Sequence, residues 1–244
     1  MIPLKDLTPR RSFPIVTLLL ILINVAVFIY QITLPAHAAQ TFVNTYAVIP
    51  ARIQSALAGH HYSLVTALLP LFTCMFLHGG WLHIIGNMWF LWIFGANVED
   101  RMGPMSYLIF YLLCGVGSSI AQTAFSWGSH IPALGASGAI SGVLGAYIVF
   151  FPTSQIYTLV TLFIIWFRAR IPAIVFIGLW FVIQALSAYG TLGGAGHIEE
   201  GGVAWWLISA ASSSGSSSQK LSPGQIPVAP STLNFVDPPT LQVQ

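Results

Sequence analysis

The residue with the clearest chemical potential in this chain is Ser137, in the segment Gly135-Ala136-Ser137-Gly138 at the start of an apolar run that ends at Phe151. A serine in this setting has two interpretations. It can be a packing residue, because small residues let helices approach closely in lipid. It can also be a nucleophile, provided that a base and a set of oxyanion donors lie near it. The second interpretation requires partner residues elsewhere in the chain.

Three polar side chains, at the approach to another apolar run and within it, could be such partners: His78, His83 and Asn87. His83 and Asn87 are four residues apart, which places them on one face of a helix, about one turn from each other. Both could donate hydrogen bonds to a developing negative charge, as an oxyanion hole requires. Two alternatives stay open: hydrogen bonds between neighbouring helices, and a metal site, although no Asp, Glu or Cys of the membrane region supplies further ligands.

The run that begins at Ser137 is rich in small residues at helical spacing. Ser137, Ser141 and Gly145 repeat every four residues, and Gly138 and Gly142 form a GxxxG pair beside them. Such a helix can be tightly surrounded, which predicts a central position in a bundle. Ser137 would begin this helix, where its own N–H lacks a partner within the helix and could be a third oxyanion donor.

The elements that must position these residues are membrane helices. Hydrophobic residues make up 56% of the chain and charged residues only 6%, against about 25% charged residues in a typical soluble domain. The net charge of +2 gives no indication of nucleic-acid binding. We therefore predict an all-α fold, a polytopic membrane helix bundle. Runs that approach the roughly 20 residues needed to cross a bilayer predict five spans: Phe13–Leu34, Leu82–Val98, Met105–Phe125, Ser137–Phe151 and Ile171–Tyr189.

The other apolar segments and the cysteines have simpler interpretations. The shorter run Ile156–Phe167 predicts a hairpin or an interfacial segment between spans. We expect Phe13–Leu34 to be a retained anchor, because its apolar core is longer than the ~7–15 residues of a signal peptide. Cys74 and Cys114 lie in apolar context and are expected to be buried thiols.

Charge predicts the orientation of the bundle. Threading the chain in and out of the membrane places most cations on one side, as the positive-inside rule requires, with Arg52 as the exception. The cations of that side are Lys5, Arg10, Arg11, Arg101, Arg168 and Arg170. We therefore expect a cytoplasmic N-terminus, in a bacterial plasma (inner) membrane, with Ser137 near the opposite surface.

Taken together, these residues resemble the rhomboid family of intramembrane serine proteases. The matching elements occur in order between about Phe13 and Trp206. They are His78…His83-x-x-x-Asn87, Glu99-x-x-x-Gly103-x-x-x-Tyr107, Gly135-x-Ser137-Gly138 and Val203-Ala204-Trp205-Trp206. The resemblance implies a bundle of six helices around a water-filled cavity, which cleaves transmembrane protein substrates near the membrane surface.

The resemblance also implies roles for single residues. Ser137 would be the nucleophile, while His83, Asn87 and the Ser137 backbone N–H would form the oxyanion hole. Glu99 would anchor the loop between the second and third spans. The motif residues with a structural or cavity-shaping role would be His78, Glu99, Gly135 and Gly138. The resemblance implies no cofactor and no metal ion.

The resemblance fails at one catalytic residue. Members of the family use a Ser–His dyad, with the histidine in an Ala-His-x-x-Gly context just after the tryptophan pair. Here Trp206 is followed by Leu207-Ile208-Ser209, and no histidine follows His197. The sixth span is also truncated, because the Ser-rich stretch from Ser212 cannot form an apolar helix of the required length. As written, the base expected near Leu207-Ile208 is absent.

Two other histidines do not replace it. His130 and His197 lie in predicted loops, and a general base must lie within hydrogen-bond reach of its nucleophile. We interpret both as solvent-exposed polar residues.

A shift of reading frame accounts for the missing histidine. If one G of a GGG run at the Trp206 codon has been lost, one permitted back-translation turns residues 207–218 into Ala-His-Ile-Gly-Gly-Phe-Val-Val-Gly-Leu-Leu-Leu. This segment contains the expected histidine and an apolar helix in place of the serines. We hypothesise that everything from Leu207 onward is translated out of frame.

The sequence thus predicts a cytoplasmic N-terminus (1–12), a rhomboid-like membrane domain (13–208) and a low-complexity tail (209–244). The leading function is an intramembrane serine endopeptidase that lacks its base as written. The alternative is a non-catalytic pseudoprotease that binds transmembrane segments. A small transporter or channel has little support, because the spans hold few charged residues.

Overall fold

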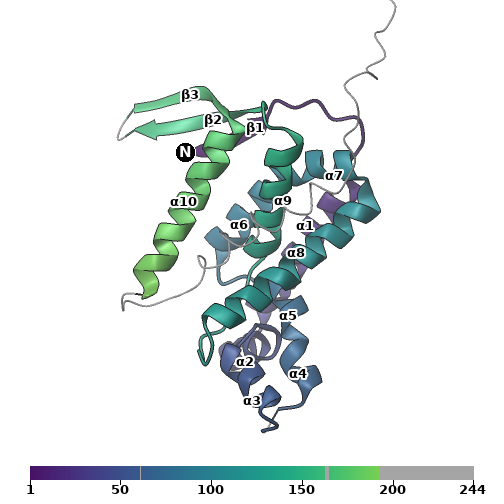
Figure 1. The fold of residues 1–244 in the computed structure, drawn as a ribbon, viewed down its shortest axis with the longest axis vertical. Coiled ribbons are helices and arrows are strands. Elements are labelled where there is room, and N and C mark those ends of the chain that lie inside the picture. Colours follow the sequence, from purple (N-terminus) through teal and green to yellow (C-terminus); the bar gives the residue numbers. More distant parts are fainter. Residues whose placement is uncertain (61, 163–164, 193–244) are drawn as a thin grey trace, which may run out of the picture.

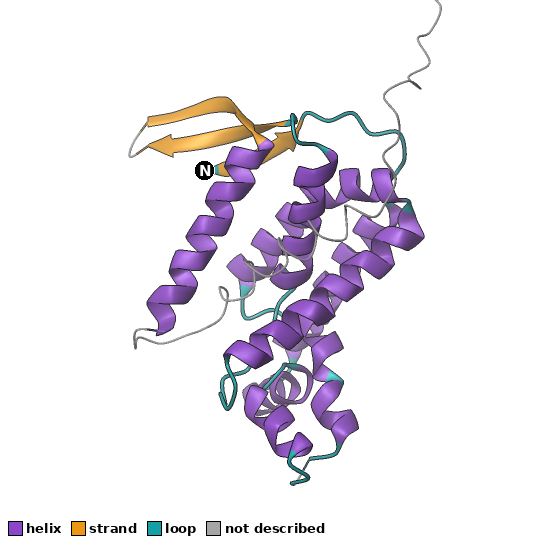
Figure 2. Ribbon diagram, in the orientation of Figure 1, coloured by secondary structure: helices purple, strands orange, loops and turns teal. Residues whose placement is uncertain are grey.

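A computed structural model describes residues 1–60, 62–162 and 165–192. Within these ranges the helices form a bundle, and a three-stranded antiparallel sheet lies at one end of it (Figures 1 and 2). The helices are α1 (Ile15–Thr33), α2 (Ala36–Tyr46), α3 (Pro50–Leu57), α4 (Leu64–Leu68), α5 (Pro70–Thr73), the 3₁₀ turn η1 (Cys74–Phe76), α6 (Trp81–Phe90), the π-helical segment η2 (Leu91–Gly95), α7 (Ala96–Met102), α8 (Pro104–Phe125), α9 (Ser137–Phe150) and α10 (Ala173–Leu192). The strands are β1 (Ile2–Asp6), β2 (Gln155–Leu162) and β3 (Ile165–Pro172).

Each of the five predicted spans is helical over most of its length, with shifted ends. The second span is the continuous run of α6, η2 and α7, and the fifth begins at Ala173 because Ile171 and Pro172 end β3. In the described part of the chain, α1 and α8 are long and apolar enough to cross a membrane. The helical segments 64–76 and 81–102 meet at a bend of 75°. Counted together as one broken span, they make a third. The shorter apolar helices are Ser137–Phe150 and Ala173–Val182.

The prediction of an all-α fold is correct for most of the chain but missed the sheet. Strands β2 and β3 pair antiparallel as a β-hairpin, and β1 pairs with β2 as the third strand. The hairpin was one of two interpretations of Ile156–Phe167, and the structure extends it beyond that range. Its strands are rich in β-branched and aromatic residues, which favour extended structure.

The segment 1–12 joins the bundle through this sheet and through polar contacts. The Trp89 indole N–H donates to the carbonyl of Pro3 at 2.6 Å, and Asn97 donates to the carboxylate of Asp6. The backbone N–H of Ser12 donates to Asp100 at 2.8 Å. The first twelve residues therefore pack against α6, η2 and α7 rather than standing apart from them.

Helix α9 lies at the centre of the bundle, between α8 and α10 (Figure 1). Every residue from Ala139 to Tyr147 is buried, as the small-residue pattern predicts. A β-carbon on Gly138 would lie 1.9 Å from Oγ of Ser118, and one on Gly142 would lie 2.4 Å from Sγ of Cys114. The glycines thus let α9 contact α8 directly.

The two ends of the bundle differ in charge and structure. The sheet end carries the six cations predicted to share one side, whereas Arg52 lies on α3 near the opposite end, where α2 to α5 pack together (Figure 1). Cys74 and Cys114 are free thiols; Cys74 is buried, as expected, whereas Cys114 is only partly buried. The truncated sixth span that the sequence predicts, the motif at 203–206 and the predicted tail at 209–244 lie outside the described residues.

Candidate active site

Ser137 is the first residue of α9, where a helix presents free backbone donors. The preceding Gly135 has φ +122°, a conformation open mainly to glycine, and Ala136 is the N-cap. The N–H groups of the first turn of a helix have no carbonyl partner within the helix. The helix dipole adds partial positive charge at the same place. The Ser137 hydroxyl is thus set beside donors suited to an anion.

His83 lies directly against the turn that precedes Ser137. A β-carbon on Gly135 would lie 2.6 Å from Nε2 of His83 and 3.8 Å from Oγ of Ser137. The imidazole and the hydroxyl are therefore both within 4 Å of one point. No side chain larger than hydrogen fits at residue 135 while His83 keeps this position.

The other nitrogen of His83 indicates which one bears the proton. Nδ1 of His83 accepts a long hydrogen bond, 3.4 Å, from the backbone N–H of Gly79. In a neutral imidazole, a nitrogen that accepts has no proton, so the proton lies on the other nitrogen. Nε2, the atom nearest Gly135, is thus assigned as an N–H donor.

Asn87 lies one turn further along α6 than His83. Its Nδ2 is buried and has no hydrogen-bond partner among the described residues. Such a donor is uncommon in folded proteins and is available to a ligand. The i, i+4 spacing predicted that His83 and Asn87 share a face, and the structure places them so.

A cavity of about 110 Å³ brings these side chains together. Ser137, His83 and Asn87 all line it. The remaining lining residues are Leu82, Gly86, Phe90, Ile140, Trp180 and Gln184. The volume suffices for a few water molecules or for the reacting part of a peptide.

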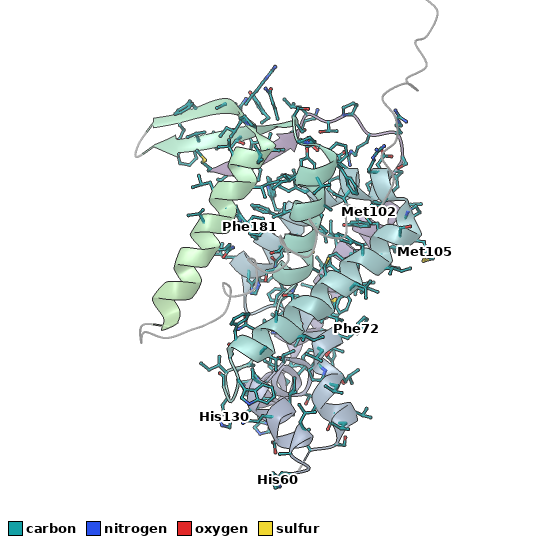
Figure 3. All side chains as sticks on the ribbon, viewed as in Figure 1. His60, Phe72, Met102, Met105, His130 and Phe181 are labelled. Carbon is teal, nitrogen blue, oxygen red and sulfur yellow. The ribbon has the colours of Figure 1, made fainter. Side chains whose placement is uncertain are left out.

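Trp180 and Gln184 were not predicted from the sequence. They are one turn apart on α10, and the Trp180 ring lies 5.5 Å from that of Phe90 across the cavity wall. Phe181, labelled in Figure 3, lies on the side of α10 that faces the bundle. The available signal was an amide, Gln184, in an otherwise apolar run, since a polar side chain at membrane depth is a functional candidate.

His78 lies behind the cavity rather than on its wall. It is fully buried, and its ring centroid is 5.1 Å from that of His83, edge to face. Its backbone carbonyl accepts a 2.9 Å hydrogen bond from Gln31 of α1. His78 therefore packs against His83 without lining the cavity itself.

Glu99 lies away from the cavity and caps α1. Its carboxylate accepts hydrogen bonds from the N–H groups of Val16 (2.9 Å) and Thr17 (2.7 Å) and from the Thr17 hydroxyl (2.7 Å). A carboxylate at a helix N-terminus satisfies free donors and complements the dipole. Within the same motif, Gly103 adopts φ +81° at the turn into α8, and Tyr107 is fully buried.

His130 is exposed in the loop before α9 and points outward near α2 (Figure 3), away from the cavity. His197 and the position 207–208 expected to hold the base lie outside the described residues.

In the part of the chain that the structure describes, no three or more His, Cys, Asp or Glu side chains group as a metal site would require.

Comparison with known proteins identifies the family. A model of the Rhomboid domain matches residues 65–209, more than half of the chain. The chain is 33% identical over 138 residues to Rhomboid protease GluP of Bacillus subtilis (strain 168), which is 56% of this chain and 25% of that protein. It is 37% identical over 76 residues to RHOMBOID-like protein 5 of Arabidopsis thaliana, 31% of this chain and 25% of that protein.

A third relative is Presenilin-associated rhomboid-like protein A, mitochondrial, of Danio rerio, 33% identical over 93 residues, 37% of this chain and 24% of that protein. The chain thus spans about a quarter of the length of these relatives. The chain belongs to the rhomboid family, multi-pass integral membrane proteins for which the family-level activity is serine intramembrane proteolysis.

Proposed function

We propose that this protein is a rhomboid-type intramembrane serine endopeptidase that cleaves transmembrane substrates, and that the chain as written lacks its general base. The observation that supports the proposal most is the cavity lined by Ser137, His83 and Asn87. These three side chains come from two helices, and their types match a nucleophile and two oxyanion donors.

In the proposed reaction, which needs the histidine base that the restored reading frame would supply, Oγ of Ser137 attacks the scissile carbonyl carbon of the substrate. The base takes the hydroxyl proton of Ser137 and later gives it to the leaving amine. Negative charge then develops on the carbonyl oxygen. The N–H of Ser137, Nε2–H of His83 and Nδ2–H of Asn87 would stabilise that charge, because donors that the fold holds in place need no reorganisation during the reaction. Collapse of the tetrahedral intermediate expels the amine and leaves an acyl-enzyme on Ser137, which water hydrolyses.

The length of α9 supports cleavage inside the membrane. Its 14 residues extend about 21 Å, whereas the hydrocarbon core is about 30 Å thick. With the C-terminal end of α9 at the membrane boundary beside the sheet, Ser137 lies about 10 Å inside the opposite boundary. A transmembrane substrate would therefore be cut near, but below, the membrane surface.

We further propose five complete spans and a cytoplasmic N-terminus, in a bacterial plasma membrane. The support is the gathering of Lys5, Arg101 and Arg168 with the other predicted cytoplasmic cations at the sheet end of the bundle. The positive-inside rule then assigns that end to the cytoplasm.

The end of the family match supports the frame-shift hypothesis. The match stops at residue 209, two residues after the position where the proposed shift begins.

Without a base, the Ser137 hydroxyl is a weak nucleophile. Removal of one member of a catalytic triad lowers the rate about 10⁴- to 10⁶-fold.

The test compares two chains in liposomes that contain a model transmembrane substrate. One is the chain as written, and the other, the frame-restored chain, has one G added at the Trp206 codon. We expect no measurable cleavage by the first and cleavage by the second. The gene sequence is an independent check, because a leucine codon beginning TT at Leu207, or no histidine codon in the alternative frame, would rule out the shift.

The second candidate is a pseudoprotease that binds transmembrane segments without cutting them. The absence of histidine after His197 in the sequence favours it. Photo-crosslinking of the folded chain as written to a transmembrane peptide, with no cleavage by the folded frame-restored chain, would support this candidate over the protease.

A further inference from the structure

The two faces of the sheet differ in burial. On the central strand β2, Ile156 and Thr158 are fully buried, whereas Tyr157 is partly exposed. Side chains alternate between the faces of a strand, so Ile156 and Thr158 define an inner face toward the bundle. Their neighbours define an outer face, on which Trp166, Arg168 and Arg170 are exposed.

Register assigns the members of the outer face. Tyr157 pairs with Arg170 and with Lys5, and Thr161 pairs with Trp166. On β3, Arg168 lies between Trp166 and Arg170, and it pairs with Leu159 of β2. The outer face thus combines three cations with two aromatic rings: Lys5, Arg168, Arg170, Tyr157 and Trp166.

This outer face has no acidic residue to balance its cations. The only acid of the three strands, Asp6, pairs with Ile156 on the inner side. There its carboxylate accepts hydrogen bonds from Asn97 and from the N–H of Thr8, the latter at 2.9 Å. Lys5, Arg168 and Arg170 are exposed. The face therefore presents charge of a single sign.

The sheet is fixed directly to a membrane helix. Pro172 ends β3 and Ala173 begins α10 with no linker between them, and the N–H of Ala173 donates to the carbonyl of Ser154 at 2.8 Å. The hairpin extends sideways from the start of α10, away from α7 and α8 (Figure 1).

We propose that the outer face of this sheet, Lys5, Tyr157, Trp166, Arg168 and Arg170, binds anionic phospholipid headgroups of the leaflet at the sheet end of the bundle. Arginine forms paired hydrogen bonds with phosphate oxygens, and its long stem lets the guanidinium reach them across apolar surface. Trp166 adds an aromatic ring of the kind enriched at membrane interfaces.

The exposed aromatic residues favour lipid over an acidic peptide as the occupant. Trp166 is 65% exposed on the outer face, and Phe167 is 46% exposed on the inner one. A peptide docked on one face would leave the other ring in water. An interfacial lipid environment surrounds the end of the hairpin and accommodates both rings.

The test measures the relative association of spin-labelled phosphatidylglycerol and phosphatidylcholine with the full chain in phosphatidylcholine vesicles, by electron paramagnetic resonance. We expect a several-fold preference for phosphatidylglycerol, since each cation near a membrane surface contributes at most roughly fivefold. The R168Q/R170Q double variant should lose most of this preference. High salt should weaken it in the unmodified chain.

Two controls and three outcomes decide the proposal. R52Q removes a cation from the other end of the bundle and should leave the preference unchanged, and circular dichroism checks that each variant is folded. Equal association of both lipids with the unmodified chain would overturn the proposal. So would an unchanged preference in the folded double variant, or Arg168-dependent binding of a soluble polyglutamate peptide without any lipid preference. None of these measurements depends on proteolysis.

Discussion

At the scale of single residues, the site depends on one close approach, that of the Gly135 turn to the His83 ring. A methyl group at residue 135 would meet Nε2 of His83 at 2.6 Å and would also require a left-handed backbone at φ +122°. The turn, the imidazole and Ser137 are therefore fixed relative to each other. This geometry would align the three proposed donors with the nucleophile.

We expect Gly135→Ala to lower proteolysis by the frame-restored chain about 100-fold or more, because misplacement of reacting groups by about 1 Å has effects of this size. Cleavage of the model substrate is the measurement. Gly80→Ala is the matched control, since Gly80 has an extended backbone and open space around it. Equal losses in both variants would contradict the explanation.

Asn87 offers a cleaner separation of chemistry from folding. Its Nδ2 makes no hydrogen bond within the described chain, so Asn87→Ala should leave the melting temperature nearly unchanged. In the frame-restored chain it should lower kcat about 10²- to 10³-fold, as loss of an oxyanion donor does. A parallel fall in melting temperature would instead indicate a structural role between helices.

The same residues show what sequence can predict about a site. Ser137, His83 and Asn87 were identified because helical spacing within one segment places Asn87 near His83, and a family motif relates both to Ser137. Trp180 and Gln184 line the same cavity but were missed. Their position depends on how α10 packs against α6 and α9, which periodicity within α10 does not determine.

At the scale of elements, the contact between α8 and α9 sets the position of Ser137. Ser118 and Cys114 of α8 lie over Gly138 and Gly142 of α9, so two i, i+4 pairs face each other. Side chains at both glycines would push the helices apart. The start of α9 would then move away from α6, and the cavity between them would change shape.

Gly138→Ala should lower stability by about 1–3 kcal/mol, the usual cost of overpacking, which a thermal melt in detergent would detect. Ser118→Gly should restore part of the loss in the double variant, because the two sites are in contact. Gly117→Ala is the control on the same helix pair, since a β-carbon there has nothing within 4 Å. Independent, additive effects of residues 138 and 118 would contradict the packing argument.

Glu99 links two other elements, α7 and α1. Glu99→Gln removes the charge that three donors share, and we expect a loss of about 1.5–3 kcal/mol, typical of hydrogen bonds to a charged group. Asp100→Asn, on the same helix but partly exposed, should cost less because water can replace its bonds. Melting temperatures that fall equally in the two variants would argue against a special role for the buried carboxylate.

The helices were easier to predict from the sequence than the sheet, for physical reasons. Long apolar runs identify membrane helices because a bilayer requires their length. The sheet was missed because β1 and β2 are separated by about 150 residues, and nothing local in residues 2–6 specifies a partner strand. The hairpin of β2 and β3 was anticipated as one alternative, since Pro152 and Arg168 interrupt the apolar pattern there.

At the scale of the whole molecule, a bundle closed by a sheet at one end holds a small polar cavity beside the start of its central helix. The cavity has donors and a hydroxyl, whereas the sequence has no histidine after His197. Membership of the rhomboid family explains the first feature. We propose the frame shift as the explanation of the second.

The most direct test is labelling by a fluorophosphonate probe, which reacts only with an activated serine. We compare the chain as written, the frame-restored chain and the frame-restored chain with Ser137→Ala, each checked for folding by circular dichroism. The account predicts labelling of the frame-restored chain alone. Ser137-dependent labelling of the chain as written, or no labelling of a folded frame-restored chain, would contradict it.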